Sequence, residues 1–149
     1  DNYGEGYHIP FIHPVLNKQL DMRTYRVDAF DRWTRHSASM RDGSPAAGVW
    51  LWRFPNLALN VYADGMNVER FTPVTATTTR IDYLYFFRDG AADEEAMKQS
   101  NDLLAEDAAI CEAVQRNLEA GVYQTGILSP KHEGGLVLLH RLVREALGS

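Results

Sequence analysis

Two histidines near the start of the chain, His8 and His13, carry the clearest chemical signal in the sequence. Neutral imidazole is the commonest protein ligand for borderline divalent metals. Their spacing is one residue too long for two ligands on a continuous helical face, where they stand four residues apart. Pro10 and Pro14 predict that a helix ends between the histidines, with His8 in its last turn and His13 in the turn that follows. This arrangement would let both rings reach one metal ion.

The third ligand must come from elsewhere in the chain, and the best candidate is Asp107. The residues after it recur at helical spacing and predict an inward apolar face: Ile110, Cys111, Val114 and Leu118. Asp107 lies one turn before the first two, on or beside that face. A carboxylate directed into an apolar core is costly unless it is paired, hydrogen-bonded or bound to a metal. Three neighbouring carboxylates remain alternatives: Asp102, Glu106 and Glu112.

Two histidines and one carboxylate with open coordination positions form the facial triad of non-heme Fe(II) oxygenases. Two other classes of protein remain possible from these residues. A zinc-dependent hydrolase with the same ligands would need a general base, and Glu5 is near enough in sequence to serve. A non-catalytic domain that binds hydrophobic ligands would need neither histidine.

Residues 2–14, NYGEGYHIPFIHP, resemble the iron motif N-Y-x-E-C-Y-H-x-x-x-x-H-P of the Rieske-type ring-hydroxylating oxygenases, found in the catalytic domain of their alpha subunit. Residues 54–57 with 60–62, and residues 106–115, resemble that family's central strand and its last-ligand helix. The resemblance runs over nearly the whole chain. Gly6 is a departure, because a cysteine is common at that position.

The resemblance implies that His8, His13 and Asp107 hold a mononuclear Fe(II). It implies that Glu5 links this iron to a Rieske cluster, usually that of a neighbouring subunit, while Asn2 and Tyr7 are expected to hydrogen-bond around the iron. The implied activity is O2-dependent hydroxylation, as ring hydroxylation or oxidative demethylation, with electrons from NAD(P)H through a reductase or ferredoxin. The implied assembly is a homo-oligomer, a trimer in the full-length protein.

A Rieske [2Fe–2S] cluster needs two cysteines and two histidines, and this chain has one cysteine, Cys111. The cluster is therefore expected on a part of the protein that precedes this sequence. We expect residues 1–149 to be part of one iron-binding catalytic domain, truncated at its N-terminus and inactive in isolation.

Composition agrees with an ordinary globular domain of 149 residues, with a hydrophobic fraction of 45% and a charged fraction of 23%. The net charge of −5 offers no broad basic patch for nucleic acid. No apolar run approaches the roughly 18 residues of a membrane span. The single cysteine argues against a disulfide framework and predicts a cytoplasmic location.

A block of strands followed by long helices indicates the α+β class. Strands are predicted at residues 24–30, 33–40, 48–54, 57–62, 66–71 and 77–87. Helix is predicted from about residue 93 to 120, with a break near Asn101–Asp102, and again over residues 135–147. The resemblance implies a curved antiparallel sheet around a long C-terminal helix, the helix-grip arrangement of START and Bet v 1-like proteins.

Such a sheet and helix would enclose a pocket, and the strands supply many rings for its wall: Trp50, Trp52, Phe54, Tyr62, Tyr83, Tyr85, Phe86 and Phe87. Phe54, Tyr85 and Asn56 are the predicted substrate-binding residues. Asn60 is a second asparagine in strand territory, where asparagine is disfavoured. An aromatic pocket would attract a quaternary ammonium by cation–π interaction or stack on an aromatic substrate. The segment from Glu112 to Glu133 resembles the branch that acts on choline, betaines and carnitine.

Overall fold

The computed structural model describes residues 3–42, 48–129 and 131–148. Six strands form one sheet in the order of the sequence, and every neighbouring pair is antiparallel. With helices following the strands, the chain belongs to the α+β class. The strands are β1 (Leu20–Ala29), β2 (Trp33–Met40), β3 (Gly48–Arg53), β4 (Leu57–Tyr62), β5 (Gly65–Pro73) and β6 (Thr79–Phe87).

The predicted strands are all present, and β2 and β4 have the predicted bounds. The largest differences are at β1, which begins four residues before the predicted start at Thr24, and at β5, which extends further at both ends. These extra residues carry no clear alternation of their own. They are held by pairing with neighbours, Leu20 opposite Met40 and Pro73 opposite Thr79.

The long helix α3 (Glu94–Glu119) is continuous, so the predicted break near Asn101–Asp102 is wrong. Asp93 caps the helix by accepting a hydrogen bond from the Ala96 amide at 2.9 Å. Asp102 forms an i,i+4 ion pair with Lys98, and Asn101 accepts a hydrogen bond from the Tyr85 hydroxyl. These side-chain contacts occupy groups that would otherwise compete for the helix backbone, so the helix passes through both residues.

The predicted inward face of α3 is also wrong. Ile110, Val114 and Leu118 are 44%, 44% and 47% exposed, and Cys111 is exposed. Polar contacts from Ser100, Asn101 and Glu106 tie the helix to the sheet and to His13, and they set its rotation. The helix therefore directs Asp107 toward the sheet and leaves its most apolar stripe half exposed.

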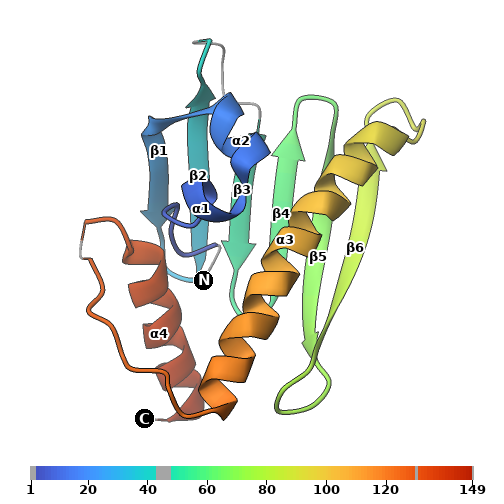
Figure 1. Cartoon of the computed structure of the whole chain (residues 1–149). Helices are drawn as coiled ribbons and strands as arrows, with labels where there is room; N and C mark the ends of the chain where they lie inside the picture. The colour runs from blue at the N-terminus through green and yellow to red at the C-terminus, as the bar shows by residue number, and fades with distance from the viewer. Residues whose placement is uncertain (1–2, 43–47, 130, 149) are drawn as a thin grey trace.

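Helix α4 (Gly134–Leu147) supplies the main packing on the sheet. Leu138 and Leu142 form one buried cluster with Trp52 of β3 and Ala58 of β4. Its strong amphipathic pattern explains why the prediction of residues 135–147 was accurate to one residue. All four helices lie on the same face of the sheet (Figure 1). Over the described residues, no helix combines the length and apolar character that crossing a membrane would require.

Two short helices, α1 (Ile9–Ile12) and α2 (Pro14–Gln19), replace the single helix end predicted between the histidines. His8 immediately precedes α1, and His13 lies at the junction of α1 and α2. Pro10 lies in the first turn of α1 and Pro14 begins α2, positions where the missing amide hydrogen costs nothing. The two prolines therefore lie at the beginnings of helices, and the predicted helix end between the histidines is replaced by two helix starts.

Candidate metal centre

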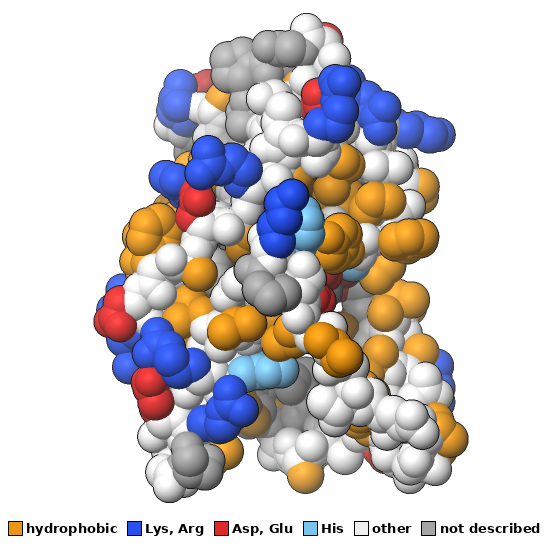
Figure 2. Space-filling view, turned by 90° about the vertical axis from the view of Figure 1, so that its left-hand side faces the viewer, with side chains coloured by type: hydrophobic (Ala, Val, Ile, Leu, Met, Phe, Trp, Pro, Cys, Tyr) orange, Lys and Arg blue, Asp and Glu red, His pale blue; other side chains and the backbone are white. Residues whose placement is uncertain are grey.

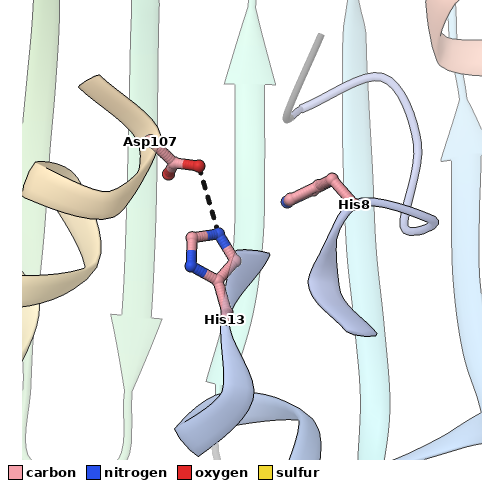
Figure 3. A group of neighbouring side chains, drawn as sticks. All are labelled: His8, His13 and Asp107. Carbon is pink, nitrogen blue, oxygen red and sulfur yellow. Dashed lines mark ion pairs between the residues drawn. The ribbon is translucent and has the colours of Figure 1, made fainter. Parts of the chain in front are cut away.

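His8 and His13, at the two ends of α1, converge with Asp107 of α3, which is far away in the sequence. Each offers a ligand atom, and these atoms all lie within 4.8 Å of one another. His8 and His13 project from the ends of α1, and Asp107 projects from the middle of α3 toward them (Figure 3). Their side chains face one common point, as metal ligands would.

A carboxylate fixes the orientation of each imidazole. His8 Nδ1 lies 2.8 Å from Glu5 Oε1, and His13 Nδ1 lies 2.8 Å from Glu106 Oε2. An Nδ1–H that donates to a carboxylate leaves Nε2 unprotonated, which is the tautomer that binds a metal. Glu5 also accepts hydrogen bonds from the backbone amides of Tyr7 and His8, which holds it in place. Both rings are therefore arranged with Nε2 available for coordination.

Asp107 carries a buried oxygen that accepts no hydrogen bond from any residue that the structure describes. Its Oδ1 lies 3.1 Å from His13 Nε2, but it is poorly aligned with that nitrogen for a hydrogen bond. A buried carboxylate oxygen without a donor is costly, and a cation between Asp107 and the imidazoles would remove that cost. The donor set of two imidazoles and one carboxylate therefore fits Fe(II).

The pKa values of His13 and Glu5 reflect this crowding of carboxylates. Burial alone would lower the pKa of His13, but the carboxylates of Asp107 and Glu106 outweigh burial and raise it. Burial would raise the pKa of Glu5, but its hydrogen bond with His8 and the backbone amides lower it. The excess of negative charge over the imidazoles favours a divalent cation at this point.

Glu106→Ala tests the role of the carboxylate behind His13. We expect the affinity for Fe(II) to fall by about 10-fold to 100-fold, because His13 loses the acceptor that fixes its tautomer and ring orientation. Competition with a coloured chelator measures this affinity. Glu95→Ala is the matched control, since Glu95 is exposed on the same helix and accepts a hydrogen bond from Gln99. Equal affinity in the Glu106 and Glu95 variants would contradict a positioning role for Glu106.

The candidate centre opens onto a cavity of about 920 Å³ between the sheet and α3. His8, His13 and Asp107 line it, and so do the rings of Trp50, Trp52, Tyr62 and Tyr83. In Figure 2, hydrophobic side chains surround a hollow in which acidic side chains are visible. A cavity of this size, mostly apolar with a few polar groups, suits a small organic molecule.

None of the three predicted substrate-binding residues lines this cavity. Phe54 packs against the buried cluster under α4, and the Asn56 amide donates to the Phe71 carbonyl at 2.9 Å. Tyr85 shares a face of β6 with Tyr83 but lies further along the strand, where it bonds Asn101. Trp50 and Asn60 lie in the cavity wall instead.

The other predicted residues have different positions. Glu5 is buried beside His8, as described above. Tyr7 is 51% exposed, its ring lies against His132, and it does not line the cavity that the metal ligands line. Asn2 lies outside the described residues.

His36 and Tyr25 line the cavity and were not predicted. Burial lowers the pKa of His36 to about 4, and its Nε2 and Nδ1 lie 2.7 Å from the Tyr3 carbonyl and the Tyr25 hydroxyl. The Tyr25 ring fills the space beside Gly6, where an added Cβ would lie 2.4 Å from a ring carbon. The departure at Gly6 thus has a steric reason that the sequence could not reveal.

Comparisons with known proteins agree with this geometry. The chain is 29% identical over 160 residues to chloroplastic choline monooxygenase of Arabidopsis thaliana, covering 95% of this chain and 38% of that protein. For the Beta vulgaris choline monooxygenase the identity is 25%, covering 99% of this chain and 36% of that protein. The chain thus spans well under half the length of these curated relatives.

Solved structures share the fold. A quaternary ammonium Rieske monooxygenase described in terms of carnitine oxidation and inter-subunit electron transfer superposes with a TM-score of 0.82 at 24% identity, covering 97% of this chain and 45% of that chain. CntA in complex with L-carnitine gives a TM-score of 0.79, also at 24% identity, covering 97% of this chain and 43% of that chain. The sequence profile described as the ring hydroxylating alpha subunit (catalytic domain) matches residues 1–149. The chain therefore belongs to the ring-hydroxylating alpha-subunit family, in the part that forms the catalytic domain.

Proposed function

We propose that residues 1–149 form a catalytic domain in which His8, His13 and Asp107 hold Fe(II) for O2-dependent monooxygenation. The observation that carries this proposal is the convergence of the three ligand atoms within 4.8 Å of one another, one of them on a buried carboxylate whose Oδ1 has no donor among the described residues. Three protein ligands leave coordination positions open, and bound iron supplies the activation of dioxygen that organic side chains cannot provide. We also infer that the sheet and helices form a helix-grip arrangement.

The proposed substrate is a small quaternary ammonium compound. The rings of Trp50, Trp52, Tyr62 and Tyr83 give the cavity wall faces that attract a cation, about 0.5–2 kcal/mol for each contact. The same walls exclude water from the site. The relatives named as choline monooxygenases support this substrate class over a neutral aromatic compound.

The proposed reaction inserts one oxygen atom of O2 into a C–H bond of the substrate. The other oxygen atom leaves as water, which requires two electrons and two protons from outside this domain. We infer that the electrons come from a Rieske [2Fe–2S] protein and a reductase, with Glu5 on their path because it contacts His8 at 2.8 Å. A homotrimer that brings a neighbouring Rieske centre near Glu5 belongs to the same proposal. A cytoplasmic location stays a prediction, since the plant relatives are named chloroplastic.

Oxygen uptake tests the function. The protein is loaded anaerobically with Fe(II), supplied with a reduced Rieske protein and its reductase, and given choline as the probe substrate. We expect one O2 to be consumed for each choline oxidised, with no product under argon and none from zinc-loaded protein. Hydrolysis of an ester such as acetylcholine by zinc-loaded protein under argon would instead identify a hydrolase. Choline binding without any oxidation in the complete mixture would identify a non-catalytic pocket.

A further inference from the structure

A buried carboxylate without a cationic partner lies in the wall of the same cavity, apart from the three metal ligands. Glu69 of β5 is 4% exposed and lines the cavity together with Asn60 and Tyr83. Its side chain points to the helix-covered face of the sheet, where Asn67 and Phe71 also point by strand alternation. The metal-centre proposal assigns no role to this residue.

Every group that hydrogen-bonds the Glu69 carboxylate is neutral. Tyr3 Oη lies 2.9 Å from Glu69 Oε1, Asn60 Nδ2 lies 2.5 Å from it, and the Tyr83 hydroxyl is a third donor. Tyr3 Oη is also 2.9 Å from Asn60 Oδ1, so its single proton is shared between two acceptors. Within the part of the chain that the structure describes, no Lys, Arg or His side chain forms an ion pair with Glu69.

This arrangement leaves a negative charge to be balanced. Burial raises the pKa of Glu69, against the effect of its hydrogen bonds from Tyr83, Tyr3 and Asn60, and the nearby Asp107 carboxylate raises it further. A cation at the candidate metal centre would neutralise the charge of Asp107, which is one of its proposed ligands. Glu69 would still lack a counter-charge, because its contacts are neutral donors.

The surroundings of Glu69 define which cation would fit. The rings of Trp50, Trp52, Tyr62 and Tyr83 share the cavity with it and offer π faces. Tyr3, Asn60 and Tyr83 already use most of the acceptor positions of the carboxylate. A cation with no N–H donors, which needs charge and apolar contact but no hydrogen bond, matches this wall better than a primary amine.

We propose that Glu69 is the counter-charge for the cationic head of the substrate and sets the preference of the cavity for a quaternary ammonium over a neutral molecule of the same shape. The inference rests on the proposed function, since it concerns the same cavity. It assigns a specificity-determining role to one side chain, held in position by Tyr3, Asn60 and Tyr83.

The test compares choline with its uncharged carbon isostere, 3,3-dimethylbutan-1-ol. Calorimetry under anaerobic conditions on the Fe(II)-loaded protein gives a dissociation constant for each ligand without turnover. We expect the wild type to bind choline at least about tenfold more tightly than the isostere, and Glu69→Gln to remove about tenfold or more of that preference. Binding of the isostere should change by less than about twofold, because Gln keeps the shape of the side chain and one acceptor oxygen for Tyr3 and Asn60, while the Tyr83 hydroxyl can accept from its amide.

Two further variants complete the design. Glu119→Gln removes the same charge from an exposed position on α3 outside the cavity, and it should keep the wild-type preference. Glu69→Asp withdraws the carboxylate by one methylene, and a several-fold loss of preference is expected because the Coulomb energy falls with distance. This variant decides the matter if Glu69→Gln does not fold.

Three results would overturn the proposal: a wild type that binds both ligands equally, a Glu69→Gln variant that weakens both by the same factor, or a Glu69→Gln variant that keeps the preference. The second result would make Glu69 a structural residue. Failure of the proposed function gives a different pattern, because wild-type protein would then fail to oxidise choline whatever the ratio of the two dissociation constants.

Discussion

Asp107→Ala is expected to abolish stoichiometric Fe(II) binding, with an affinity at least about 100-fold below that of the wild type. The change removes one of the three proposed ligands and leaves His8 and His13, whose two bonds would hold a divalent ion far more weakly. It also removes a buried oxygen that accepts no hydrogen bond from the described residues. The folded state should therefore persist without metal, and elemental analysis after dialysis measures the loss directly.

Asp102→Ala is the matched control for this prediction. Asp102 lies on the same helix, carries the same charge and is paired on the surface with Lys98, outside the cavity. We expect its iron content to equal that of the wild type. Full iron content in Asp107→Ala would contradict the assignment and move the third ligand to Glu106 or Glu112.

Gly135→Ala is expected to destabilise the protein by about 1–3 kcal/mol and to weaken Fe(II) binding at a distance, because a tight backbone contact would be overpacked. A Cβ at Gly135 would lie 2.5 Å from the carbonyl oxygen of Gly4 and 2.7 Å from its Cα. The Tyr3 carbonyl accepts from Thr34 and lies 2.7 Å from His36 Nε2, so this segment cannot easily move away. Displacement of Gly4 would therefore be transmitted to Glu5 and His8.

Gly134→Ala provides a neighbouring control in the same helical turn. No atom lies within 4 Å of a Cβ at Gly134, so this change should be neutral or stabilise by up to about 1 kcal/mol through lower backbone entropy in the unfolded chain. Urea unfolding measures both variants, and chelator competition measures their iron affinity. Equal stability of the two variants would show that α4 and the histidine segment are not packed as tightly as the structure indicates.

Much of the sheet could be predicted because its strands carry their own signals. The strands predicted at residues 33–40 and 57–62 have the same bounds as β2 and β4 in the structure. The Asp64–Gly65 turn correctly predicted the hairpin between β4 and β5. The amphipathic period of α4 was equally clear. Each of these features depends on neighbours in the sequence, which is why the sequence alone was sufficient.

The predictions that failed depend on contacts between distant residues. The rotation of α3 is set by the hydrogen bonds that Ser100, Asn101 and Glu106 form with the sheet and with His13. The apolar residues of the helix instead predicted that a different face points inward. Phe54 and Asn56 lie between β3 and β4, outside the cavity that Trp50 and Asn60 line, and only the three-dimensional arrangement distinguishes the two pairs. Propensity cannot decide which face of a strand is covered when both faces carry rings.

Glu69 was the functional candidate that the sequence analysis missed, although a signal was available. On β5 it stands two residues from both Asn67 and Phe71, so all three side chains point to the same face of the sheet. An acidic residue therefore lies among inward-facing positions. A carboxylate on a buried face requires an explanation in the same way as Asp107 does. His36 on β2 could have been questioned on similar grounds.

The most direct test of the central claim is a crystal structure of the Fe(II)-loaded protein with data collected at the iron absorption edge. The anomalous difference map should contain one strong peak, bonded to Nε2 of His8, Nε2 of His13 and a carboxylate oxygen of Asp107. A peak elsewhere, or no peak at this point in protein that retains one iron per chain, would contradict the account.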